Sequence, residues 1–166
     1  MSNAATASAA APASTSAVAP SGPRPTSRSL HEVAQLLGGR VWLERQLFER
    51  LGAWSSGPGT ASARLHLADA SRRHGWHAQV WFDRLPELSV IDAEALVVAP
   101  DDRLVELFER LDGVPSSDDD DAAVVRLDGY GRVLLPRMIV AYRSTLDRLG
   151  VAADASLARW SRIVSA

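Results

Sequence analysis

Apolar residues recur at three- and four-residue spacings from about residue 30, and this spacing is typical of an amphipathic helix. Ser29 directly precedes the pattern and is a residue type that caps helices. Gly52 and the Ser/Gly/Pro stretch at 55–59 end it. The sequence therefore predicts a long first helix, whose apolar stripe consists of Leu30, Val33, Leu37, Val41, Leu47, Phe48 and Leu51.

A second pattern of the same period runs from about Thr60 to Leu85 and stops before Pro86. The residue before a proline disfavours the helical conformation, so we expect the helix to end there. Two long helices joined by a short Gly/Pro turn predict an antiparallel pair. The stripe of this second helix mixes small, aromatic and polar residues: Ala63, Leu67, Ala70, His74, Ala78, Trp81 and Leu85.

A connection and a short helix are expected next. Residues 86–100 have no helical period and predict an irregular connection, with an extended stretch at 95–99. Asp101 or Asp102 is then expected to cap a short helix. The apolar face of this helix consists of Leu104, Leu107, Phe108 and Leu111.

The last part of the sequence predicts one long helix and one short one. After a polar loop at 116–121, a helical pattern spans about 122–149, with Gly150 expected just beyond its end. Pro136 lies inside this pattern and should kink or break the helix, because proline removes a backbone donor and crowds the preceding turn. Residues 154–164 predict a short last helix.

These elements together predict an all-α protein: an up-down helical bundle with a shortened last helix, at residues 28–166. Residues 1–27, which precede it, are almost entirely Ala, Ser, Thr, Pro and Gly. Such a segment cannot bury enough apolar surface to offset the entropy lost on ordering. We therefore expect a disordered N-terminal tail in front of a single folded domain.

The composition excludes several classes of function. The 166 residues carry a formal charge of −2, and the 18 basic residues, all arginine, are interleaved with 20 carboxylates. Nucleic-acid binding is not expected, because a nucleic-acid binder concentrates positive charge on one face. The absence of cysteine excludes disulfides, zinc fingers and thiol nucleophiles. With neither a long apolar run nor the features of a signal peptide, we expect a cytoplasmic protein that does not contact membranes.

Three polar residues interrupt the apolar stripes of the first two helices. Glu44 lies on the apolar face of the first, where a carboxylate is costly unless it is paired, hydrogen-bonded or metal-bound. His74 lies on the stripe of the second helix, and His77 follows three residues later on the same side. This spacing predicts that the three side chains converge. One interpretation is a metal site for iron, manganese or zinc; the other is a buried hydrogen-bond network.

The sequence does not encode a complete helical di-metal site. Such sites take one Glu from each of two helices and a Glu-x-x-His motif from each of two others. Ser71 stands where the motif needs a Glu before His74, and residues 124–166 contain neither Glu nor His. We therefore expect a degenerate or absent metal site in a binding or structural module. The alternatives are a non-haem metal-dependent oxidoreductase whose Glu/His site a partner chain completes, and a small-molecule binder with a cavity beside Glu44.

Several segments carry a resemblance to a known family. The most specific are His-Gly-Trp-His at 74–77 and Leu-Pro-Arg at 135–137, supported by the pattern at 41–54. Through them, residues 30–165 resemble a family of uncharacterised ferritin-like bundle proteins of high-GC Gram-positive bacteria. The resemblance implies a ferritin-like fold and brings no established activity. Related chains continue the last helix further, which implies an apolar groove here that a second copy or a protein partner would cover.

Overall fold

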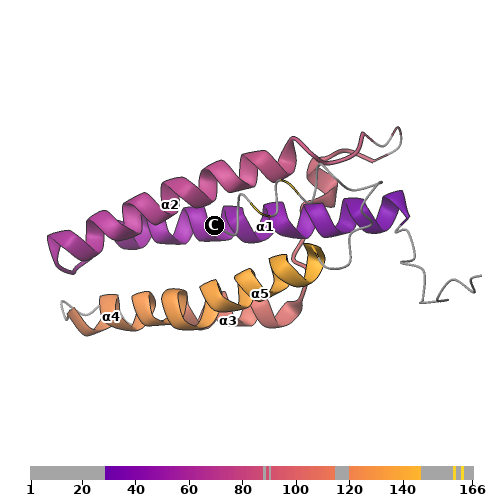
Figure 1. Cartoon of the computed structure of the whole chain (residues 1–166). Coiled ribbons are helices and arrows are strands. Elements are labelled where there is room, and N and C mark those ends of the chain that lie inside the picture. The colour runs from indigo at the N-terminus through magenta and orange to yellow at the C-terminus, as the bar shows by residue number, and fades with distance from the viewer. Residues whose placement is uncertain are drawn as a thin grey trace, which may run out of the picture.

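The computed structural model describes residues 29–87, 89, 91–114, 120–146, 159 and 162, and every element formed within these ranges is a helix. Figure 1 shows two long helices lying side by side as an antiparallel pair, with a third helical stretch running alongside them. The α-helices in chain order are α1 (Leu30–Ser55), α2 (Ala61–Phe82), α3 (Asp102–Asp112), α4 (Asp120–Asp128) and α5 (Leu135–Leu146). The predicted all-α class is confirmed.

α1 begins where the sequence predicts. The Ser29 hydroxyl accepts from the Glu32 backbone N–H at 3.2 Å, and the Ser29 backbone N–H donates to the Glu32 carboxylate at 2.7 Å. This reciprocal capping box satisfies two donors that a helix start otherwise leaves unpaired. Three members of the predicted apolar stripe are not buried: Leu30 is 59% exposed, Phe48 is 47% exposed, and Val33 is partly buried. Leu30 is in the first turn, and Phe48 lies on the outer side of the α1–α2 pair against Gly75.

α2 is capped by Thr60, whose hydroxyl accepts from the Ala63 backbone N–H at 3.2 Å. Five of the seven predicted stripe residues are buried in this helix, as expected: Leu67, Ala70, His74, Ala78 and Trp81. The helix ends at Phe82, and residues 83–85 form turns instead of continuing to Leu85.

The connection after α2 packs against α1. Residues Glu94–Leu96 form a 3₁₀ turn, η1, so the predicted extended stretch at 95–99 is wrong for its first two residues. The Leu96 carbonyl oxygen lies only 1.8 Å from where a Cβ at Gly38 would stand, so the absence of a side chain at Gly38 makes this contact possible. α3 then follows with Asp101 as its N-cap, and its side chain accepts from the Arg103 backbone N–H at 2.9 Å.

The long helix predicted over about 122–149 is interrupted. α4 begins at Asp120, and the π-helical segment η2 (Gly129–Leu134) separates it from α5. The Leu135 backbone N–H donates to the carbonyl of Tyr130, five residues earlier, immediately before Pro136. Proline has no N–H and its ring crowds the carbonyl four residues back, so a wider turn at this point relieves the clash. The break predicted at Pro136 is confirmed and takes the form of a π segment.

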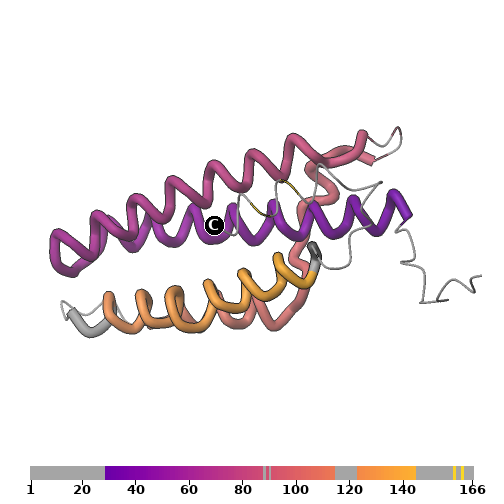
Figure 2. Tube along the Cα trace, viewed as in Figure 1, coloured from indigo at the N-terminus to yellow at the C-terminus, as the bar shows by residue number. Residues whose placement is uncertain are grey.

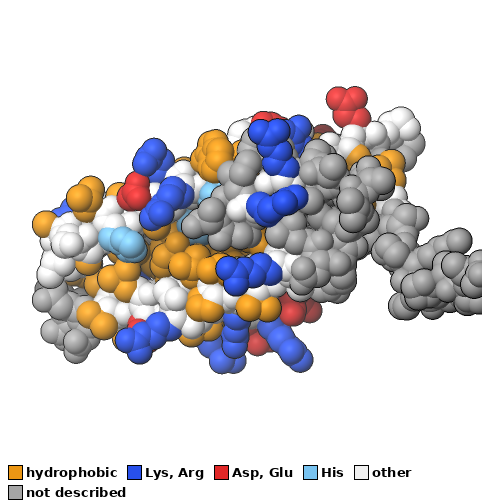
Figure 3. All heavy atoms as spheres, viewed as in Figure 1, with side chains coloured by type: hydrophobic (Ala, Val, Ile, Leu, Met, Phe, Trp, Pro, Cys, Tyr) orange, Lys and Arg blue, Asp and Glu red, His pale blue; other side chains and the backbone are white. Residues whose placement is uncertain are grey.

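The core lies between the α1–α2 pair and the α3–α5 stretch. Figure 2 shows α4 and α5 running along the α1–α2 pair. In the space-filling view, hydrophobic side chains gather between the α1–α2 pair and α4–α5, with arginines around them (Figure 3). No helix in the described part of the chain is long and apolar enough to span a membrane. The predicted tail at 1–27, the end at Gly150 and the last helix at 154–164 lie outside the described residues, apart from Arg159 and Arg162, which have helical backbone.

Candidate metal centre

Glu44 lies at the centre of α1, and its side chain is completely buried, with 0% of its surface exposed. It shares one helix face with Val41, Leu47 and Leu51, which are also fully buried. The same periodicity that puts these apolar residues in the core therefore puts the carboxylate there. A carboxylate in this environment needs compensating partners, because its transfer from water is strongly unfavourable.

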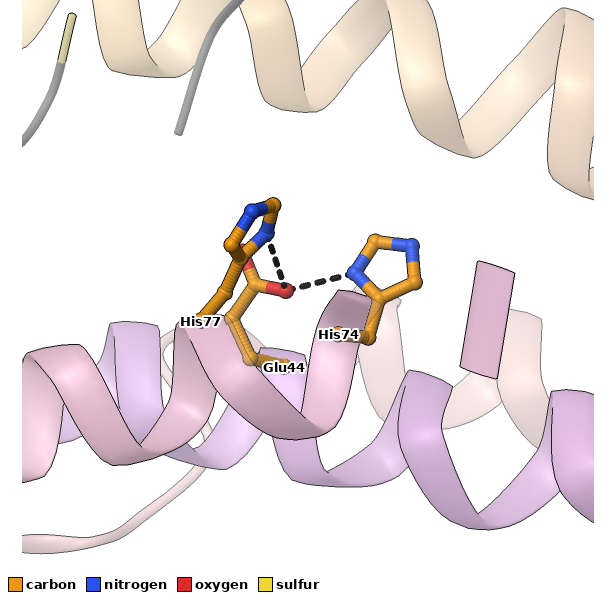
Figure 4. Close-up of side chains that lie close together, drawn as sticks. All are labelled: Glu44, His74 and His77. Atoms are coloured by element: carbon orange, nitrogen blue, oxygen red, sulfur yellow. Dashed lines mark hydrogen bonds and ion pairs between the residues drawn. The ribbon is translucent and has the colours of Figure 1, made fainter. Parts of the chain in front are cut away.

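Two histidines on α2 are partners of this carboxylate (Figure 4). Nδ1 of His74 lies 2.5 Å from Oε2 of Glu44, and Nδ1 of His77 lies 3.6 Å from the same oxygen. Their rings meet edge to face, with centroids 5.9 Å apart, because residues three apart are neighbours on a helix surface. One candidate donor atom from each of the three residues lies within 4.8 Å of the others. The three side chains therefore lie together, as the spacing indicated.

Two tyrosines also contact this cluster, one from η2 and one from α5, and they are the only tyrosines in the sequence. The Tyr130 hydroxyl is 2.9 Å from Nε2 of His74, and the Tyr142 hydroxyl donates to Oε1 of Glu44. A chain of hydrogen bonds thus runs from Tyr130 through His74 and Glu44 to Tyr142. The helical periodicity of the sequence did not indicate Tyr130 as a neighbour of the cluster.

The environment keeps the carboxyl ionised and the phenols neutral. Burial raises the pKa of Glu44, but the interactions with His74 and His77 outweigh it, so the pKa is lowered. Burial, followed by the charge of Glu44, raises the pKa of Tyr142 well above its ordinary value. Burial likewise raises the pKa of Tyr130, and the charge of Glu44 adds to it. Both hydroxyls therefore keep their protons and are able to donate hydrogen bonds.

Two buried nitrogens near this cluster lack a hydrogen-bond partner among the described residues: Nδ1 of His77 and Nε1 of Trp81. The indole N–H of Trp81 interacts with the Tyr142 hydroxyl without reaching hydrogen-bond geometry. Nδ1 of His77 lies 3.6 Å from Oε2 of Glu44, which is too long for a hydrogen bond. A buried nitrogen without a hydrogen bond, next to an ionised carboxylate, is able to act with that carboxylate as a ligand of a cation.

The separations suit a shared ion. Two donors that each lie about 2.1 Å from one metal, at angles between square and tetrahedral, are about 3.0 to 3.4 Å apart. The two nitrogen–oxygen separations, 2.5 and 3.6 Å, bracket this range. The three donor atoms lie within 4.8 Å of one another, and binding of one ion would draw them closer together. In the described part of α4–α5 no carboxylate or imidazole faces the cluster, so it has donors for one ion.

The second polar cluster on α2 is different in kind. Asp69 bonds Arg72 at 2.8 Å and Arg73 at 3.2 Å, and the arginine side chains are more than half exposed. His66 is exposed on the same helix. These residues form a solvated charged face and do not converge on a buried position.

Comparison with known proteins adds no information on the site, because no family model, curated protein or solved structure matches this chain. The geometry of the described residues therefore carries the functional argument by itself. Membership of a ferritin-like family stays a prediction from sequence resemblance.

Proposed function

We propose that this chain is a metal-binding helical bundle in which Glu44, His74 and His77 hold one divalent transition-metal ion. The observation that carries the proposal is the convergence of a fully buried carboxylate with two imidazole Nδ1 atoms, one of which has no hydrogen-bond partner among the described residues. We also propose that the bundle packs in the ferritin-like manner, with this site between the α1–α2 pair and α4–α5.

The charge of the cluster supports a cation. The ionised Glu44 brings a negative charge into the buried cluster. The guanidinium of Arg40 lies 3.9 Å from the centre of the Tyr142 ring, so the phenol stands between this positive charge and the carboxylate. Transfer of a carboxylate from water to the protein interior is costly, and nearby positive charge offsets that cost. A divalent cation placed among the three donors would offset the negative charge of the Glu44 carboxylate.

The donor set favours some metals over others. Two imidazoles and one carboxylate suit iron(II), zinc and manganese, and are unlike the all-oxygen cages of calcium. Three protein donors would leave at least one coordination position for water or a small ligand. The metal would then act as a Lewis acid or a redox centre, according to its identity. Use of the site by an oxidoreductase would follow only if the bound metal is redox-active.

The test is metal content and metal uptake of the purified full chain, measured by elemental analysis and by titration with Fe²⁺, Zn²⁺ and Mn²⁺. We expect about one ion per chain, and His77→Ala to weaken binding by more than about 100-fold. Ser71→Ala is the matched control, because it removes a partly buried hydrogen bond from the same helix without touching the cluster. A folded wild-type protein that takes up none of the three metals would refute the proposal.

A second candidate is a structural module in which the same residues form a hydrogen-bond network. The observation that favours it is that His74, Glu44 and both tyrosines already have partners without any ion. This candidate predicts that added metal leaves the melting temperature unchanged. The metal-binding proposal predicts a rise, because a ligand that binds only the folded state stabilises it.

A further inference from the structure

Both tyrosines of the chain make hydrogen bonds to residues of the candidate metal centre, and each bonds a different one. We infer that Tyr130 and Tyr142 set the coordination mode of the metal: Glu44 binds through Oε2 alone, and His74 binds through Nδ1. This inference rests on the proposed metal binding and adds two positioning residues to it. Neither tyrosine needs to touch the ion.

The π segment explains how one helical stretch presents both hydroxyls to the same cluster. Residues 12 apart on an ideal α-helix differ in direction by about 120°. The one additional residue that a π turn accommodates makes them equivalent to residues 11 apart, which differ by only about 20°. Tyr130 is the second residue of η2, and the wide turn from Tyr130 to Leu135 lies between the two tyrosines and provides this correction. π turns of this kind occur frequently at functional sites.

Tyr142 occupies one oxygen of the carboxylate. Its hydroxyl donates to Oε1 of Glu44, while both imidazole Nδ1 atoms lie on the side of Oε2. The Tyr142 ring is itself held in place, because Arg40 packs over its face and donates to the Ala141 carbonyl at 3.0 Å. With Oε1 engaged, a metal among the three residues meets a single carboxylate oxygen. Without the hydroxyl, both oxygens would be free to bind the ion.

Tyr130 occupies one nitrogen of His74. Without a metal, a proton must lie between Nδ1 of His74 and Oε2 of Glu44, because two lone pairs do not approach to 2.5 Å. In a neutral imidazole Nε2 is then the acceptor, and the Tyr130 hydroxyl at 2.9 Å donates to it; in an imidazolium Nε2 donates to the Tyr130 oxygen. When Nδ1 binds a metal, Nε2 carries the proton and the Tyr130 oxygen accepts it. A hydroxyl is able to play either role, so the same contact holds the ring in both states.

The inference is tested with Co²⁺, whose visible absorption reports coordination number and ligand arrangement. Removing a hydrogen-bond partner of a metal ligand typically weakens metal binding by about 10- to 100-fold. We expect losses in this range for Tyr142→Phe and for Tyr130→Phe. In Tyr142→Phe the Co²⁺ absorption should also weaken, because a bidentate Glu44 raises the coordination number. Ser71→Ala should leave both affinity and spectrum as in the wild type.

The outcomes separate the inference from the proposed function. If wild-type protein binds Co²⁺ and both tyrosine variants match it in affinity and spectrum, the inference is overturned while metal binding stands. If the wild type binds neither Co²⁺ nor any of Fe²⁺, Zn²⁺ and Mn²⁺, the proposed metal binding fails and the inference fails with it.

A second measurement does not depend on the variants folding. In protein labelled with ¹³C at the phenol carbon, the two tyrosines give two signals. Both should shift on addition of one equivalent of Zn²⁺, because both hydroxyls bond metal ligands. Signals that stay in place while Zn²⁺ binds would also overturn the inference.

Discussion

α1 meets its neighbours in two opposite ways. Toward α2 and the connection it uses small residues: a Cβ at Gly52 would lie 3.2 Å from the Ser71 hydroxyl, and one at Gly38 would lie 1.8 Å from the Leu96 carbonyl oxygen. Toward α4–α5 it uses long polar side chains, and Glu44 and Arg40 reach across to Tyr142. The first kind of contact brings backbones together. The second keeps the layers apart and fills the space with groups that hold a proton or an ion.

This comparison teaches where a site is able to form in a small bundle. Close contacts through glycine leave no volume for an ion, and they tolerate little change in the side chains. A layer spaced by aromatic and charged side chains has room, but each polar group in it must find a partner. The candidate metal centre lies in the second kind of interface, and its unpartnered His77 nitrogen marks the position that the described side chains leave unfilled.

The largest expected effect comes from breaking the close contact. In Gly38→Ala the new methyl group would collide with the Leu96 carbonyl, which belongs to the backbone and cannot rotate away. We expect a loss of about 3 kcal/mol in the free energy of unfolding, at the upper end of overpacking effects. Urea denaturation measures it. A variant as stable as the wild type would contradict this, because it would show that η1 can shift away from the new methyl group at no cost.

The spaced interface should be sensitive at its hydrogen bonds. Tyr142→Phe leaves Oε1 of the ionised Glu44 buried without its donor, and we expect a loss of about 2 kcal/mol in metal-free protein. Ser71→Ala removes a neutral hydrogen bond to the Phe48 carbonyl in the close interface, and should cost about 1 kcal/mol. Equal losses in the two variants would contradict the difference between the interfaces.

The ionised Glu44 makes the spaced interface dependent on pH. Because the pKa of Glu44 in the folded protein lies below its ordinary value, its contribution to stability is complete above the unfolded-state pKa and is lost as the pH falls through the lower folded-state pKa. The slope contributed by one group is at most about 1.4 kcal/mol per pH unit. Unfolding of wild type and Glu44→Gln at pH 3 to 7 checks this. The variant should lack that part of the slope, and parallel curves would exclude Glu44 as its source.

The smallest effect is expected at Gly131, in the π segment. A Cβ there would meet nothing within 4 Å, in contrast to Gly38. Gly131→Ala should therefore stabilise the protein by up to about 1 kcal/mol, because alanine loses less entropy in a helix than glycine. Thermal unfolding, compared with Gly38→Ala, measures the contrast. A destabilised Gly131→Ala would mean that the π turn needs the freedom of glycine.

Much of this arrangement follows from local patterns in the sequence. The capping residues Ser29 and Thr60 and the i, i+3 spacing of His74 and His77 all depend on neighbours within one helix turn. The convergence of these histidines with Glu44 then needs only the burial of two apolar stripes against each other. Phe48 is part of the predicted stripe but is not buried, because its ring packs at the edge of the helix pair against Gly75 of α2, which has no side chain.

The contribution of Tyr130 could not be predicted in the same way. On a regular helix it would point about 120° away from Tyr142, so periodicity separates the two residues that the π segment brings together. The signal in the sequence is Pro136, which predicts a break without saying whether a residue is gained or lost. The flanking Gly129 and Gly131 are consistent with an irregular turn but do not specify its type.

The bond between Tyr142 and Glu44 joins residues 98 positions apart in the chain. Contacts of such long range form late when a protein folds, because the entropy of closing the loop comes before the gain from the contact. The α1–α2 hairpin is able to form from contacts much closer in sequence. During synthesis on the ribosome Glu44 and both histidines are therefore made before Tyr142. In a nascent chain that lacks α5, Glu44 does not yet have the Tyr142 hydroxyl as its donor. The hydrogen bonds of the cluster are complete only after α5 has been made.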